Sequence, residues 1–226
     1  DTGINRVYWD MKAKGVRWPS HKSPETNKPD PGGSYVLPGT YTAIIGYDQW
    51  IDSTEVEVRF YPRIEISNDV LTALLDLEIY SQELIPVTHD AFERLKEAEK
   101  TMAKIDEAMS LVPDSTKEEL TKLEKSLKDS ISALKLIFMN KEDFDGYDHV
   151  TKYLEDELWY YGSFTFTGYD QPGETENAAA VLLSAKVERV LGRVNDFFEN
   201  DWARYREEVE SMEKPLFEDF DPLEID

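Results

Sequence analysis

An acidic loop over residues 143–149 contains residue types that could bind a metal ion. It reads Asp143-Phe144-Asp145-Gly146-Tyr147-Asp148-His149, with carboxylates at its first and third positions, as in a calcium-binding loop, but with tyrosine at the fifth. The loop departs from the EF-hand pattern, because the sixth position is Asp148 instead of glycine and the twelfth is Leu154 instead of glutamate. The sequence therefore predicts a loop that caps a helix, with a Ca²⁺ site as the alternative.

A histidine and a glutamate, His89 and Glu93, lie one helical turn apart and could begin a zinc site. A zinc site of the HExxH type needs a second histidine on the same helical face. The other histidines, His21 and His149, are distant in sequence. We therefore expect structural or solvent-facing roles for these side chains and predict no bound metal.

Carboxylates are abundant, with 47 acidic residues against 25 basic ones and no cysteine. Glycoside hydrolysis needs two carboxyl groups that face each other across a cleft, and carboxylates on the outside of a helix do not form one. The chain shows no glycine-rich phosphate loop, no nucleophile elbow and no Ser/His/Asp arrangement. The sequence therefore predicts no catalytic residue and no cofactor, and a hydrolase that uses helix carboxylates is the weaker alternative.

Aromatic side chains gather in Trp159-Tyr160-Tyr161-Gly162-Ser163-Phe164-Thr165-Phe166. Exposed Trp and Tyr side chains can bind sugar or protein surfaces. Together with a loop tryptophan, they predict a possible interaction surface made of Trp18, Trp159, Tyr160, Phe164 and Phe166. The alternative is that these rings plug the end of a helical bundle.

A small β region, residues 1–67, precedes the helices. Residues 5–11, 40–47 and 55–61 have the apolar–polar alternation of antiparallel strands that are buried on one face. In the third segment Val56, Val58 and Phe60 form the apolar face. Residues 19–33 are rich in proline and glycine, which predicts a long surface loop.

The helical part begins near Asp69 with an apolar seam spaced by alternating fours and threes up to Met109. Because this seam does not lose phase across Pro86, it predicts one long helix kinked at that residue, with two separate helices as the alternative. Further stripes predict a helix over 115–138, a short helix over 149–161 and a last long helix over 176–212. Stripes of this length predict an elongated antiparallel bundle, because no helix can bury its stripe alone.

Charge is distributed unevenly between the two parts. Residues 1–67 carry 8 basic and 9 acidic side chains, so almost all of the net charge of −22 lies in residues 68–226. A negative field of this size repels nucleic acid and anionic lipid, so both are poor partners. No run of apolar residues is long enough to predict membrane insertion.

The segment Gly3-Ile4-Asn5-Arg6-Val7-Tyr8-Trp9-Asp10, followed by Val36-Leu37-Pro38-Gly39-Thr40-Tyr41-Thr42, resembles the second half of an immunoglobulin-like β-sandwich. It is similar to the domain that follows the propeller in bacterial sortilin-like, glycosidase-like proteins, whose C-terminal helical segment the later residues also resemble. Such sandwiches need about seven strands, and three are predicted here. The resemblance therefore implies that the chain begins inside a domain of a longer exported protein.

These observations predict an α+β protein with a partial immunoglobulin-like β region over 1–67. Residues 68–226 are predicted to form an elongated antiparallel bundle of three long helices and one short helix, with a C-terminal tail in which Phe217 or Phe220 is packed. The resemblance implies a non-enzymatic accessory region that braces its own upstream propeller or contacts another protein chain. Self-association is also possible, since three strands leave an edge unpaired. A carbohydrate-binding module that uses the aromatic surface is the alternative function.

Overall fold

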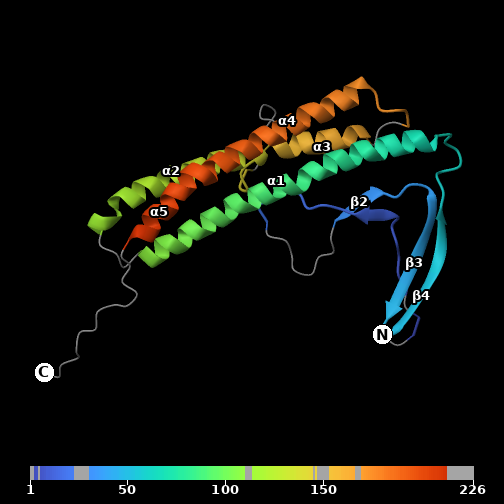
Figure 1. Ribbon diagram of the computed structural model, residues 1–226, viewed down its shortest axis with the longest axis horizontal. Helices are drawn as coiled ribbons and strands as arrows, with labels where there is room; N and C mark the ends of the chain where they lie inside the picture. The colour runs from blue at the N-terminus through green and yellow to red at the C-terminus, as the bar shows by residue number, and fades with distance from the viewer. Residues whose placement is uncertain are drawn as a thin grey trace. The chain divides into compact units, whose positions relative to one another are not determined.

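The computed structural model describes residues 3–4, 6–22, 31–109, 114–144, 146, 153–165 and 169–212. The protein is a mixed α+β structure of two small antiparallel sheets and a set of helices that dominate the chain, which confirms the predicted fold class (Figure 1). The predicted packing of the tail residues Phe217 and Phe220 lies outside the described residues.

The strands are β1 (Lys12–Lys14), β2 (Gly32–Tyr35), β3 (Gly39–Tyr47) and β4 (Trp50–Val58). The helices are α1 (Asn68–Ala108), α2 (Asp114–Phe138), α3 (Leu154–Thr165) and α4 (Glu174–Asp196). A π-helical segment, η2 (Phe197–Trp202), and α5 (Ala203–Ser211) follow α4 directly. No described helix is long and apolar enough to cross a membrane.

The chain divides into two compact units. Unit 1 holds residues 1–89 and 155–186, and unit 2 holds residues 90–154 and 187–226. This division passes through α1 and α4, whereas the predicted boundary after residue 67 separates strands from helices. Each unit therefore combines segments that are distant in sequence, and each is described below by itself.

The β3–β4 hairpin of unit 1 confirms the predicted strand over 40–47, and β4 begins five residues before the predicted start of its strand. Its register pairs Tyr41 with Val56 and Tyr47 with Trp50. The predicted strand over residues 5–11 is wrong, because its described residues carry no strand and β1 begins only at Lys12. The loop predicted over 19–33 is also shorter in the structure, because Gly32 already belongs to β2, which pairs with β1.

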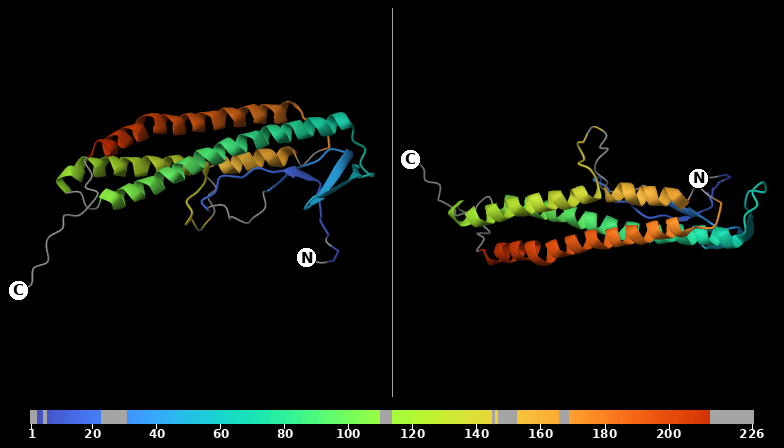
Figure 2. Two further views of the ribbon diagram at one scale, coloured as in Figure 1. Left: turned by 60° about the horizontal axis from the view of Figure 1, so that its bottom comes forward. Right: turned by 90° about the horizontal axis from the view of Figure 1, so that it is seen from above.

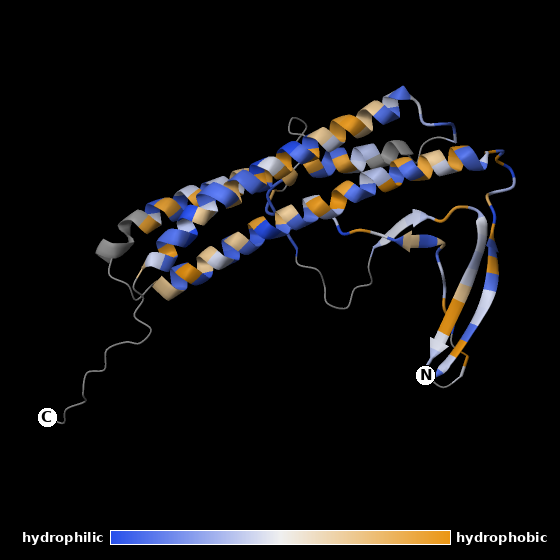
Figure 3. Ribbon diagram, viewed as in Figure 1, coloured by the Kyte–Doolittle hydropathy of each residue, from blue (hydrophilic) through white to orange (hydrophobic). Residues whose placement is uncertain are grey.

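Helix α1 runs without interruption through Pro86, which confirms one helix and excludes the two-helix alternative. Proline removes one backbone hydrogen bond inside a helix. Every residue of the predicted seam from Val70 to Met109 is at least half-buried, so packing on both sides of the proline keeps the helix in phase. Figure 3 shows this seam as alternating apolar bands along α1.

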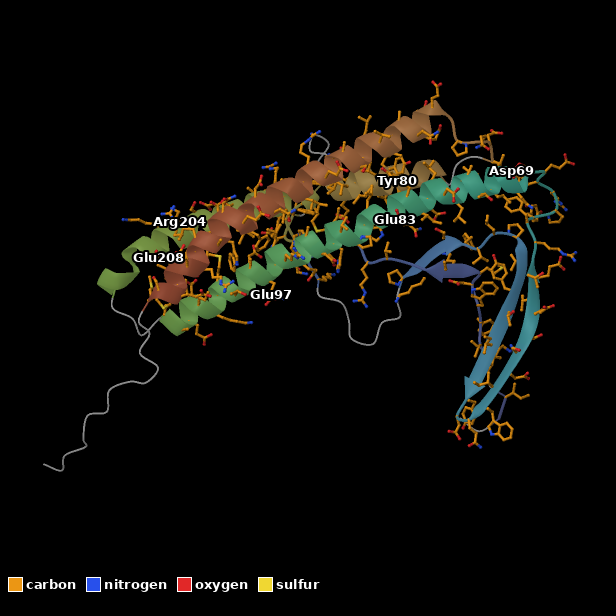
Figure 4. All side chains as sticks on the ribbon, in the orientation of Figure 1. Asp69, Tyr80, Glu83, Glu97, Arg204 and Glu208 are labelled. Carbon is orange, nitrogen blue, oxygen red and sulfur yellow. The ribbon has the colours of Figure 1, made fainter. Side chains whose placement is uncertain are left out.

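The core of unit 2 is formed by the last part of α1, by α2 and by the end of the α4–α5 helix. Two ion pairs, Lys128 to Asp106 and Lys135 to Glu99, join α2 to α1 and set the two helices antiparallel. Phe92 and Phe138 are both fully buried, with ring centroids 5.6 Å apart. Charged side chains such as Glu97, Arg204 and Glu208 project from the helices of this unit (Figure 4).

The π-helical segment η2 keeps the last helix in register with the core of unit 2. Phe197 is buried, and in an α-helix the residue one turn later would be Asp201, which is exposed. A π turn contains one extra residue, so the next residue facing the core is Trp202, followed by buried Tyr205 and Val209. The predicted helix over 176–212 is therefore present but is not uniformly α-helical. Figure 2 shows α4 and α5 as one continuous course.

Candidate functional site

A groove of ≈ 500 Å³ in unit 1 is a candidate ligand site. Its walls come from the segment around β1, from β2, from one stretch of α1 and from α3. The volume lies within the range of small-molecule sites. Because these four segments are far apart in sequence, only folding brings their side chains together.

Two tryptophans predicted as interaction residues, Trp18 and Trp159, both line this groove. Trp159 is 66% exposed, so one of its surfaces is available to a ligand. Trp18 is half-buried, and its carbonyl oxygen lies 3.0 Å from Nδ1 of His89 on α1. This contact, together with the burial of Pro19, holds residues 18–19 against α1.

A polar network lies on the α1 side of the groove. The amide nitrogen Nε2 of Gln82 donates to Oγ of Ser34 at 2.8 Å and to Oε1 of Glu78 at 3.1 Å. Burial raises the pKa of Glu78, while hydrogen bonds from Ser34 and Gln82 and the charge of Lys12 act in the opposite direction. The groove therefore presents a carboxyl group, an amide and a cation beside its two tryptophans.

Glycines allow the strand segments that wall the groove to approach closely. A Cβ atom on Gly33 would lie 2.7 Å from the carbonyl oxygen of Lys14, and one on Gly15 would lie 2.5 Å from that of Pro31. These distances are too short for any side chain. The Gly15 amide donates to the Pro31 carbonyl at 2.7 Å and closes this end of the β1–β2 pair.

The other predicted interaction residues are not all at the groove. Tyr160 is 60% exposed and is not among the residues that line it. The Phe164 side chain and all of Phe166 lie outside what the structure describes. For Trp159 and Tyr160, the alternative that these rings plug the bundle end is wrong, since both rings are largely exposed.

The residues considered for metal binding have other partners. His89 contacts the carbonyl oxygen of Trp18, and Glu93 forms an ion pair with Lys96 at 2.7 Å. Most of the acidic loop over 143–149 lies outside the described residues, so its predicted capping role stays a prediction. Within the described part of the chain, no group of three or more His, Asp or Glu side chains could hold a metal.

A buried carboxylate, Glu124, lies in the core of unit 2. It is 7% exposed and accepts a 2.9 Å hydrogen bond from the hydroxyl of fully buried Tyr205. Burial, together with a hydrogen bond to Asp106, raises the pKa of Glu124. A hydrogen bond from Lys128 lowers the pKa of Asp106, and burial raises the pKa of Tyr205 far above its usual range. This cluster links α1, α2 and α5.

We predict that Glu124→Gln makes the protein more stable relative to wild type as the pH rises. When folding raises the pKa of a carboxyl group, its protonated form stabilises the folded state. This stabilisation is complete below the ordinary pKa of Glu and is lost as the pH rises through the raised pKa. Glutamine keeps an oxygen that accepts from Tyr205 but cannot ionise. Urea unfolding at intervals from about pH 5 to about pH 8 measures the difference.

Asp129→Asn, an exposed change on the same helix, is the control and should follow wild type. A constant difference between Glu124→Gln and wild type would contradict the prediction.

Sequence reasoning missed Glu78 and Gln82, which look like ordinary surface positions of an amphipathic helix. A signal was present in the seam of α1, which contains the polar residues Ser81 and Thr88 among apolar ones. Both hydroxyls donate to carbonyls of their own helix, to Glu78 at 2.8 Å and to Ile85 at 2.7 Å. Of these two polar positions, Ser81 lines the groove and Thr88 does not, so the signal at Ser81 is the one that marks the site.

The chain was compared with family models, with curated proteins and with solved structures, and none of them matches it.

Proposed function

We propose that this chain is a non-enzymatic interaction region that contacts protein through the free edge of β3. The observation that carries the proposal is the composition of that strand. Its nine residues, Gly39–Tyr47, include no charged side chain and no proline. In the described part of the chain, β3 pairs only with β4, so its other edge has no strand partner.

Large apolar side chains on β3 and beside the turn of the hairpin are exposed. On β3, Ile44 is 68% exposed and Tyr47 is 81% exposed, and Trp50 across the hairpin is 71% exposed. Figure 3 shows an apolar, orange band on β3 just before its arrowhead. Proteins usually protect an edge strand with charge, proline or a cover, and an isolated hairpin is only marginally stable in water. The β3 edge carries neither charge nor proline, and Trp9 packs on Tyr41 near the start of the strand, with ring centroids 5.5 Å apart. The exposed half of β3 around Ile44 is therefore suited to pair with another strand.

The partner that fits this edge is a second copy of the chain. Antiparallel pairing of two β3 strands about Ala43 would place Tyr41 opposite Ile45 and Thr42 opposite Ile44, with no charge on either strand. Pairing through β4 would instead bring together carboxylates such as Asp52 and Glu55. Residues 1–67 contribute little to the net charge of −22, so repulsion between two copies is smallest here.

A contact of this kind fits an accessory region whose task is structural. The resemblance to sortilin-like propeller proteins, and the exported location that it implies, stay predictions. Bracing of an upstream propeller would use the same free edge, with a strand of the parent protein in place of the second copy.

We predict that Thr42→Lys with Ile44→Lys weakens self-association at least about tenfold. In the proposed pairing each new lysine lies directly opposite a lysine of the other copy, and like charges in this position are destabilising. Both residues are exposed in the single chain, so the hairpin itself should keep its fold. Sedimentation equilibrium from about 1 µM to about 200 µM measures the monomer–dimer constant.

The matched control is Ser53→Lys with Glu55→Gln. These residues pair with Ile44 and Thr42 across the hairpin, and the double change adds the same charge to β4. The control should associate as wild type does. Equal weakening by both variants would place the contact elsewhere, and a wild-type chain that stays monomeric throughout would overturn the second copy as the partner.

A further inference from the structure

The groove of unit 1 combines flat apolar surfaces with hydrogen-bonding groups of both kinds. Trp18 and Trp159 supply the apolar surfaces. Lys12 supplies a donor, and Glu78 supplies a carboxyl group that can accept or, when protonated, donate. The sugar ring has the same combination, since its C–H groups pack on an aromatic face and its hydroxyl groups both donate and accept.

The amide of Gln82 is oriented by its neighbours. Its nitrogen is engaged by Ser34 and Glu78, at 2.8 Å and 3.1 Å. Within the part of the chain that the structure describes, no hydrogen bond engages its oxygen, which leaves an acceptor at the groove. Ser34 is buried, so this arrangement is set before any ligand arrives. Preorganised polar groups of this kind favour binding, because little ordering remains to be done when the ligand enters.

The electrostatics of the chain favour an uncharged ligand. A net charge of −22 repels anionic chains such as polyuronates, nucleic acid and sulfated glycans. Within the groove, Lys12 and Glu78 carry opposite charges when ionised, so neither sign of ligand charge is favoured locally. A neutral chain avoids this repulsion and still uses the polar groups.

We infer that this groove is a binding site for a neutral carbohydrate chain. Trp18 and Trp159 pack against sugar rings, and Lys12, Glu78 and Gln82 bind hydroxyl groups. The site is separate from the free edge of β3, so it neither requires nor excludes the self-association proposed above. It also assigns a role to the close approach at Gly15 and Gly33, because these glycines let the strand segments form the wall beside Lys12.

Titration of the full chain with neutral hexasaccharides tests the site. The probes are cellohexaose, xylohexaose, mannohexaose and chitohexaose, and calorimetry measures their affinity. The protein carries 5-fluorotryptophan, so that each of its five tryptophans gives a ¹⁹F signal. Binding of at least one probe should shift the signals of Trp18 and Trp159 and leave those of Trp50 and Trp202 unchanged.

The decisive variant is Trp159→Ala, which should weaken that probe at least about tenfold. Since the side chain is 66% exposed, its removal should leave the fold intact. Trp50→Ala is the matched control, because it removes an exposed tryptophan of the β3–β4 hairpin. The inference is overturned if no probe binds, if the two variants weaken binding equally, or if the shifted signals exclude Trp18 and Trp159. None of these results alters the sedimentation test of the β3 edge.

Discussion

Replacing Phe92 by alanine is expected to lower the free energy of unfolding by about 3–5 kcal/mol. The Phe92 ring is fully buried in unit 2 and packs on Phe138 with a centroid separation of 5.6 Å. Two lysine ammonium groups lie over the same ring, that of Lys96 at 6.0 Å and that of Lys135 at 5.8 Å. Alanine would remove the apolar contacts and leave a cavity that stiff helices fill poorly. Urea unfolding followed by circular dichroism measures the change.

Phe144→Ala is the control for this experiment, since it removes the same side chain from a position that is 48% exposed. We expect it to change the free energy of unfolding by no more than about 0.5 kcal/mol. If Phe92→Ala cost as little as the control, the buried contact between α1 and α2 would not be part of the core of unit 2. The two phenylalanines together therefore test where that core lies.

Deletion of a single residue is expected to be severe in α4 and mild in η2. Removing Glu188 from α4 rotates all later residues by about 100° about the helix axis. Val190, Val194 and Phe197, which are now buried, would then leave the core. Removing Asn200 from η2 instead converts a π turn to an α turn and keeps Trp202 one turn after Phe197.

We therefore expect deletion of Glu188 to abolish cooperative unfolding of unit 2, and deletion of Asn200 to change stability by about 1 kcal/mol or less. The loss of the 2.9 Å bond from Nδ2 of Asn200 to the Asp196 carbonyl is the main cost of the second deletion. Thermal unfolding measures stability, and near-ultraviolet circular dichroism reports the contact of Trp202 with Tyr205. If both deletions were equally harmful, η2 would not be a one-residue insertion that preserves the buried face.

Local patterns were enough to predict the long helices, whereas the short helix predicted over 149–161 is α3, Leu154–Thr165. The seam of α1 and the stripe of α2 repeat with the period of an α-helix, and the structure buries or half-buries their described residues. The continuity of α1 through Pro86 followed from phase, because a broken helix would not keep its apolar positions on one line. The strands of the β3–β4 hairpin were predictable in the same way from alternation.

Strand pairing was less accessible to sequence reasoning, because a strand exists only when another segment pairs with it. Residues 6–10 have the apolar and aromatic composition of a strand, but they have no strand partner among the described residues, and Val7 and Tyr8 are exposed. Residues 32–35 show no alternation, but they form β2 because Gly33 permits a close approach to β1. Pattern alone could not distinguish these two cases.

The candidate site depended on the tertiary structure to the greatest extent. The sequence by itself determined that the protein has a cluster of aromatic residues around Trp159, segments with strand alternation and helices with apolar seams. Only the tertiary structure decided that Trp18 and Trp159 share one groove with Gln82 and that Glu124 is buried beside Tyr205. The physical reason is that periodicity records what each residue faces within its own element, whereas a binding site depends on long-range packing between elements that the local pattern does not encode.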